Sequence, residues 1–195
     1  METTSINRAR SLRTLYFTRT GFQILWAVAV GATAATNPGV AAVLVILYPL
    51  WDVACTVYDL NTSALEGSAR ISQTINAVLG AGAAIGIALT VFDQAVYAIG
   101  IFGTWAFVAG LLQFATGLIR RKQLGGQWAM ILSGLQSMVA GAAFGFGGLH
   151  GKFHAKDLGG YAIFGAVYFL IAGILLSRRL SQVSSAEYGR GHHHA

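Results

Sequence analysis

Six apolar runs, each long enough to cross a bilayer, constrain this chain more than any other feature. A helix needs about 20 predominantly apolar residues to span the hydrocarbon core, and the runs cover 15–36, 38–58, 71–92, 94–119, 127–149 and 158–177. Charged residues make up only 10% of the sequence, against roughly 25% in soluble domains. We therefore predict an all-α, polytopic membrane protein with six transmembrane helices.

Short connections indicate that consecutive runs form antiparallel pairs. Asn37-Pro38-Gly39 and Asp93-Gln94 are turn signals. Weak internal repeats support the pairing, because 20–27 resembles 133–140 and 105–112 resembles 168–175. The sequence thus predicts three αα-hairpin repeats in a membrane domain at 15–177, flanked by terminal segments at 1–14 and 178–195. Such repeats can build a central transport site or simply a stable bundle, and both alternatives stay open.

The distribution of Lys and Arg predicts the orientation of the chain. Cytoplasmic segments retain these residues, and placing the N-terminus inside puts 11 of the 13 on the cytoplasmic side, leaving Lys152 and Lys156 outside. Both termini are therefore expected in the cytoplasm. The formal net charge of +6 is then a topology signal that favours contact with anionic lipids, and no nucleic-acid partner is expected.

Polar residues recur at a similar depth in the cytoplasmic half of the runs. A helix rises about 1.5 Å per residue, so the position of a residue in its run gives its depth in the membrane. Six side chains, one per run, form a layer on this basis: Gln23, Asp52, Asn76, Gln113, Gln136 and Tyr168. Pro49 removes a backbone hydrogen bond near Asp52. Polar groups in hydrocarbon need a partner or a water-filled cavity, so the layer is either a hydrogen-bond belt that sets helix register or a polar pocket centred on Asp52.

Arg19 lies inside the first run and needs a counter-charge or an exit to the lipid headgroups. Asp52 and Asp59 are seven residues apart and share nearly one helix face. We predict an ion pair or short network that joins Arg19 to Asp52 or Asp59. Asp59 is expected to mark the cytoplasmic edge.

Tryptophan, glycine and glutamine motifs give the chain a family resemblance. The segments GTWAFVAGLLQFATG at 103–117 and QWAMILSGLQS at 127–137, with YPLWDV upstream, resemble the HdeD-like family of small six-helix bacterial membrane proteins, built from a short repeat of unknown function. The resemblance implies a location in the bacterial inner membrane and, from the founding member, a role in acid stress. It implies no catalytic residues.

Other motifs are weaker. His150 and His154 are four residues apart, a spacing that can bind zinc, but a third ligand is missing and we expect no metal. The alternatives are an ordinary solvated loop and a pH sensor, because exposed histidines titrate near pH 6.5. Glycine-rich stretches at 80–86 and 141–148 are typical of close helix contacts.

The functional expectation is an integral membrane protein that is not an enzyme and has no cofactor. Neither a nucleophile with its base nor a nucleotide-binding loop is evident. The first hypothesis is an interaction or stress-related protein. The alternative is a transporter, channel or small-ligand binder that uses Asp52. Expected partners are membrane lipids, with further copies of the chain or another membrane protein on the glycine-rich faces.

Overall fold

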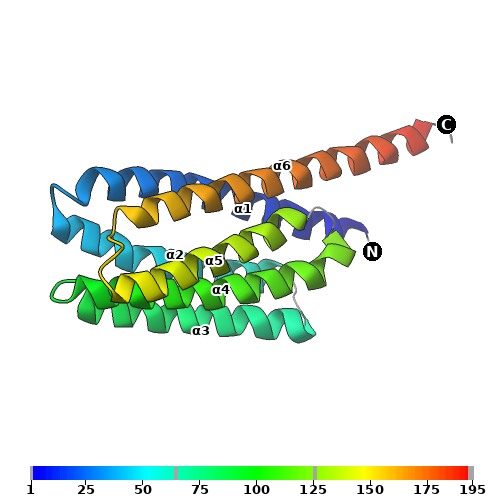
Figure 1. The fold of residues 1–195 in the computed structure, drawn as a ribbon. Helices are drawn as coiled ribbons and strands as arrows, with labels where there is room; N and C mark the ends of the chain where they lie inside the picture. The colour runs from blue at the N-terminus through cyan, green and yellow to red at the C-terminus, as the bar shows by residue number, and fades with distance from the viewer. Residues whose placement is uncertain (1, 64–65, 125–126, 193–195) are drawn as a thin grey trace.

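The computed structural model describes residues 2–63, 66–124 and 127–192, and these are helical apart from short connections. The helices are α1 (Glu2–Thr33), α2 (Pro38–Thr62), α3 (Gly67–Thr90), α4 (Ala95–Leu124), α5 (Trp128–Leu149) and α6 (Asp157–His192) (Figure 1). One helix contains most of each predicted apolar run. The all-helical prediction is confirmed.

Five of the six helices, α2 to α6, are long and apolar enough to cross a membrane. The exception is α1, because Arg19 and Gln23 lie within its apolar half and lower its hydropathy. The described chain is thus a multi-pass helical protein by length and composition. The sixth span stays a prediction.

Local sequence explains where the helices begin and end. The Asn37 side chain caps α2 by accepting a hydrogen bond from the Val40 N–H at 3.1 Å, and Pro38 occupies the first turn, where its missing N–H costs nothing. Gly151, with φ of 67°, supplies the left-handed conformation that the α5–α6 connection needs. The predicted terminal segments continue α1 and α6, except that residues 1 and 193–195 lie outside the described chain.

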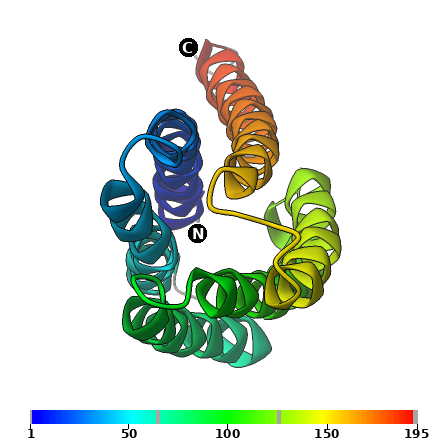
Figure 2. The same cartoon turned by 60° about the vertical axis from the view of Figure 1, so that its left-hand side comes forward.

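The six helices form a ring in chain order that α1 and α6 close (Figure 2). The most extensive pairings are α4 with α5 and α1 with α6, and the least extensive among ring neighbours is α5 with α6. The closest pairs therefore join different predicted hairpins. The packing does not show the three-hairpin repeat, which stays a prediction.

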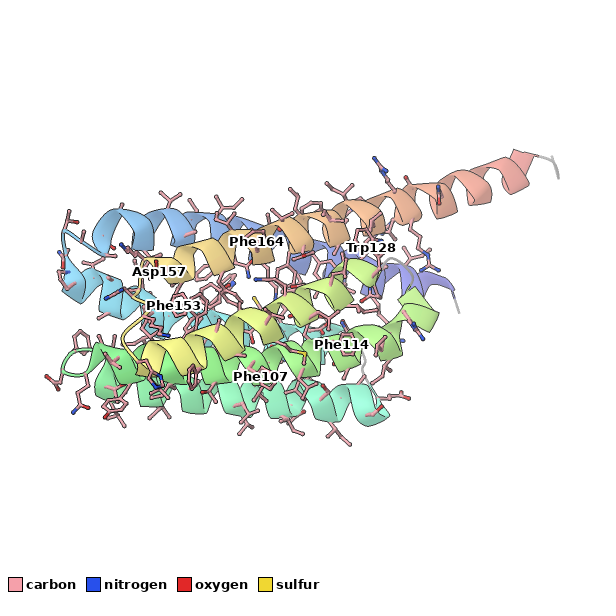
Figure 3. The ribbon with its side chains drawn as sticks, viewed as in Figure 1. Phe107, Phe114, Trp128, Phe153, Asp157 and Phe164 are labelled. Carbon is pink, nitrogen blue, oxygen red and sulfur yellow. The ribbon has the colours of Figure 1, made fainter. Side chains whose placement is uncertain are left out.

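Apolar side chains cover the outside of the ring, and many polar ones point inward. Leu25, Val28, Val78, Leu89 and Val139 are among the large apolar residues that remain exposed. Trp128 and Phe164 belong to the same set (Figure 3). Buried polar residues inside include Asp59, Asn76 and Arg120. This distribution is the reverse of that in a soluble bundle and fits a surface solvated by lipid.

Glycines seven residues apart allow α4 and α5 to approach closely. The positions are Gly103, Gly110 and Gly117 on α4, and Gly134, Gly141 and Gly148 on α5. A Cβ on Gly103 would lie 2.0 Å from the Gly145 nitrogen, and one on Gly141 would lie 2.3 Å from the Phe107 nitrogen. The backbones are thus in direct contact, as small residues permit in membrane helix pairs.

This contact predicts that Gly141→Ala destabilises the protein. The added methyl group would meet backbone rather than a flexible side chain, and overpacking of this kind costs about 1–3 kcal/mol. Thermal unfolding of the purified protein in detergent would measure the loss. Gly82→Ala is the matched control, because its Cβ would meet nothing within 4 Å. Equal stability of the two variants would contradict backbone contact between α4 and α5.

Candidate functional site

A polar cavity of about 80 Å³ lies inside the ring, and all six helices contribute to its wall. On α2, Tyr48, Asp52, Thr56 and Asp59 follow one another at intervals of three or four residues and therefore share a helix face. A similar stripe on α4 runs through Trp105, Ala109, Gln113, Thr116 and Arg120. The cavity therefore lies where polar residues recur at helical spacing on the inward faces of these helices. Within the described residues, the lipid-facing sides of α2 and α4 carry no such stripe.

Asp52 is held by two neighbouring helices. Its Oδ1 accepts a hydrogen bond from Arg19 Nη1 on α1 at 2.8 Å, and its Oδ2 accepts one from Asn76 Nδ2 on α3 at 2.8 Å. Arg19 also lies over the Phe169 ring, with its guanidinium carbon 5.0 Å from the ring centroid. The charge inside α1 is therefore compensated by a carboxylate and an aromatic face rather than by lipid headgroups.

Asp59 is more deeply enclosed than Asp52. Its Oδ2 accepts hydrogen bonds from Arg120 Nη2 at 2.6 Å and Gln73 Nε2 at 3.1 Å, and Ser63 donates to Oδ1. The side chains of this ion pair are 5% and 4% exposed, against 14% and 17% for Arg19 and Asp52. Asp59 therefore lies inside the bundle, near the end of α2 at Thr62, and its expected place at the cytoplasmic edge stays a prediction. Arg120 satisfies it from α4, which does not neighbour α2 in the ring.

Hydrogen bonds join every neighbouring pair of helices in the ring. Besides the contacts of Asp52, Gln23 donates to Tyr48 across α1 and α2, and Thr116 donates to Ser72 across α3 and α4. The remaining links are Gln113 to the Met130 carbonyl, Ser137 with Tyr161, and Thr20 to the Ala166 carbonyl. The ring therefore contains both a hydrogen-bond belt and a polar cavity, which were predicted from the sequence as alternatives.

Apolar clusters lie beyond both ends of the cavity. Away from the termini, Tyr48, Trp105 and Tyr161 line it and belong to or pack against a cluster that also contains Trp26 and Phe102. Toward the termini, Leu12, Leu15 and Tyr16 of α1 line it. Figure 2 shows the start of α1 near the middle of the ring, consistent with these contacts.

Four of the six predicted layer residues share this cavity: Gln23, Asp52, Asn76 and Gln113. Gln136 and Tyr168 are not part of its wall, although the adjacent Ser137 and Phe169 are. Adjacent residues on a helix point about 100° apart. Depth was therefore insufficient to select the inward residue on α5 and α6.

His150 and His154 lie away from the cavity, in and beside the α5–α6 connection. A ring nitrogen of His150 contacts the Phe146 carbonyl at 2.7 Å, and the His154 backbone N–H donates to Asp157 Oδ2 at 2.8 Å. The His154 ring lies 3.8 Å from the same carboxylate. These local contacts leave pH sensing as a prediction.

Four further residues line the cavity but were not predicted as site residues: Arg120, Thr56, Tyr48 and Tyr161. Arg120 belongs to the basic run 120–122, which was assigned to the headgroup region. The missed signal was spacing, because Arg120 is seven residues beyond Gln113 and shares its face. Tyr48 and Thr56 similarly flank Asp52 at four residues on either side.

The ion pairs predict that Asp59→Asn is strongly destabilising. The change leaves Arg120 buried without its counter-charge, which costs about 3–5 kcal/mol for a buried pair. Asp52→Asn should cost less because the Arg19 pair is more exposed. Chemical unfolding in detergent would compare both with Asp93→Asn, a control in an exposed turn.

The double variant Asp59→Asn, Arg120→Gln should regain part of the lost stability. It removes both charges, so that no unmatched charge stays buried. If the double variant loses as much stability as the two single variants together, Asp59 and Arg120 do not form a direct pair.

Comparison with known proteins finds no family model that matches the chain, no similar curated protein and no similar solved structure. The resemblance to the HdeD-like family therefore stays a prediction.

Proposed function

We propose that this protein binds a small polar solute in its intramembrane cavity and carries it across the bilayer. The observation that supports this proposal is the position of two Asp–Arg pairs on one cavity inside an apolar bundle. Ionisable groups in a membrane are expensive and typically mark solute or ion pathways. We assign no bond-making chemistry to the site and propose no cofactor.

The cavity is large enough to be hydrated. One water needs about 10–15 Å³ on this scale and two to four polar partners, and the cavity offers about 80 Å³ with many polar groups in its wall. A dry belt would leave no such volume. The volume therefore favours solute binding over a purely structural layer.

The proposed setting is a bacterial inner membrane with both termini in the cytoplasm and α1 as a sixth span. Eleven of the 13 Lys and Arg residues then lie on the cytoplasmic side. The Arg19–Asp52 pair supports α1 as a span, because it lowers the cost of a charge in its apolar half.

The second candidate is an interaction or stress-related protein with the polar belt as its scaffold. Continuous hydrogen bonding around the ring favours it. Each such bond contributes only about 0.6 kcal/mol on average in a membrane protein. If this candidate is correct, reagents dissolved in water do not reach the cavity.

Cysteine accessibility separates the two candidates. In a Cys55→Ser background, Ala109→Cys places a thiol on the cavity wall, and Ala106→Cys places one a turn earlier on α4 at a fully buried position of the apolar cluster. We expect a small methanethiosulfonate reagent to label position 109 from the cytoplasmic side of oriented vesicles and to leave 106 unlabelled. Equal protection of both positions would favour the scaffold.

Carriage itself is testable in proteoliposomes. Uptake of at least one solute from a panel of urea, glycine, methylammonium and acetate should exceed that of protein-free vesicles. Labelling of Ala109→Cys should block it because the adduct fills the cavity, and a reductant should restore it. A panel in which no solute crosses faster than through lipid would refute the proposal.

A further inference from the structure

A second hollow lies on the outside of the ring, between α1 and α2. Its volume is about 240 Å³, against about 80 Å³ for the inner cavity. Leu15 and Cys55 are buried and form its floor. Its sides are formed by exposed residues of both helices: Thr14, Thr18, Ala54 and Tyr58. This α1–α2 groove is therefore open to whatever surrounds the bundle.

The chemistry of the groove suits a hydrocarbon chain. The Thr14 hydroxyl donates to the Arg10 carbonyl at 3.1 Å, and the Thr18 hydroxyl donates to the Thr14 carbonyl at 2.9 Å. Both hydroxyls are thus satisfied within α1 and leave their methyl groups for packing. On the floor, Cys55 behaves as a small apolar residue beside Leu15. A polar solute would lose its hydration here without gaining these hydrogen bonds in return.

Arg10 lies in line with the groove at one end. Arg10, Thr14 and Thr18 are spaced by four residues and share one face of α1. The Arg19–Asp52 pair fixes the alignment of α1 with α2. At about 1.5 Å per residue along both helices, Arg10 lies level with the last residues of α2. The groove thus leads from the end of the spanning helix into its apolar part.

The Arg10 side chain is available to an anion. It is exposed, and the described residues give it no ion-pair partner. A guanidinium group matches the geometry of a phosphate, and an arginine at the end of a spanning helix lies among the lipid headgroups. A cation at the head of an apolar groove is complementary to a phosphate that carries an acyl chain.

We propose that the α1–α2 groove is a binding site for an anionic phospholipid, with one acyl chain in the groove and the phosphate on Arg10. The site goes beyond the proposed function, because it takes a different ligand on the opposite side of the ring wall. Leu15 lines both the groove and the inner cavity. A bound chain therefore covers the cavity wall from the lipid side at this residue.

Quenching of tryptophan fluorescence by brominated phospholipids tests the site, because Trp51 lies in the groove wall. The probes are brominated phosphatidylglycerol and brominated phosphatidylcholine, added in increasing fractions to the purified protein in detergent micelles. A Trp128→Phe background removes the exposed indole, whereas Trp26 and Trp105 are buried.

We expect half-quenching at about a fivefold lower fraction of the anionic lipid, as one arginine near a headgroup predicts. Trp51→Phe in the same background should abolish the lipid-dependent quenching. Equal half-quenching fractions for the two lipids, or quenching that persists in Trp51→Phe, would overturn the proposal.

Charge variants locate the headgroup. Arg10→Gln should raise the half-quenching fraction of brominated phosphatidylglycerol about fivefold, to that of phosphatidylcholine. Arg70→Gln is the matched control, because it removes the same charge from an exposed position on α3, away from the groove. An equal effect of both variants would show general attraction to a basic surface and overturn the assignment to Arg10.

A groove-filling variant locates the acyl chain. Ala54→Phe places a ring in the groove from an exposed position, so the fold should tolerate it, and quenching of Trp51 by both lipids should fall. Val57→Phe is the control, because Val57 is exposed on the same helix but does not line the groove. Unchanged quenching in Ala54→Phe would overturn the placement of the chain.

Discussion

The cost of placing two carboxylates of one helix in a lipid-solvated bundle determines how the other helices are arranged. An ionised carboxylate in hydrocarbon needs both a counter-charge and hydrogen-bond donors. Asp52 obtains them from α1 and α3, and Asp59 from α3 and α4, with Ser63 beside it. Half of the ring is thus tied to α2. The Arg120–Asp59 pair also connects helices that are not neighbours, which keeps the inside of the ring polar.

Two kinds of helix contact close the ring. Where α4 meets α5, glycines bring the backbones into contact, and van der Waals packing supplies the attraction. Between α1, α2 and α3, paired charges and amides hold the helices together, with one close glycine contact where Gly80 of α3 packs against Val53 of α2. The tight α4–α5 pair fixes the direction of the α4 stripe. It therefore determines where Trp105, Gln113 and Arg120 point.

Hydropathy predicted the helices, and turn chemistry predicted their connections, because both are local properties. Asn37 caps α2 as its position before Pro38 indicates. The rule that a membrane charge needs a partner predicted Asp52 or Asp59 for Arg19, and the structure pairs Arg19 with Asp52. Rotation of a helix about its axis is a tertiary property, so Gln136 was chosen where Ser137 faces inward. Arg120 was missed because its two basic neighbours gave it an adequate explanation at the headgroups.

The paired charges and the polar atoms without a hydrogen-bond partner have different physical consequences. Each ion pair is satisfied within the protein, so it stabilises the helix arrangement. The free atoms of Gln23, Asn76, Trp105 and Arg120 stabilise nothing in the closed bundle, and each costs about 1–3 kcal/mol when it stays unpaired. Apolar side chains of similar size would make a more stable scaffold. A purely structural role therefore does not explain why polar side chains occupy these positions, and this supports the proposed binding function.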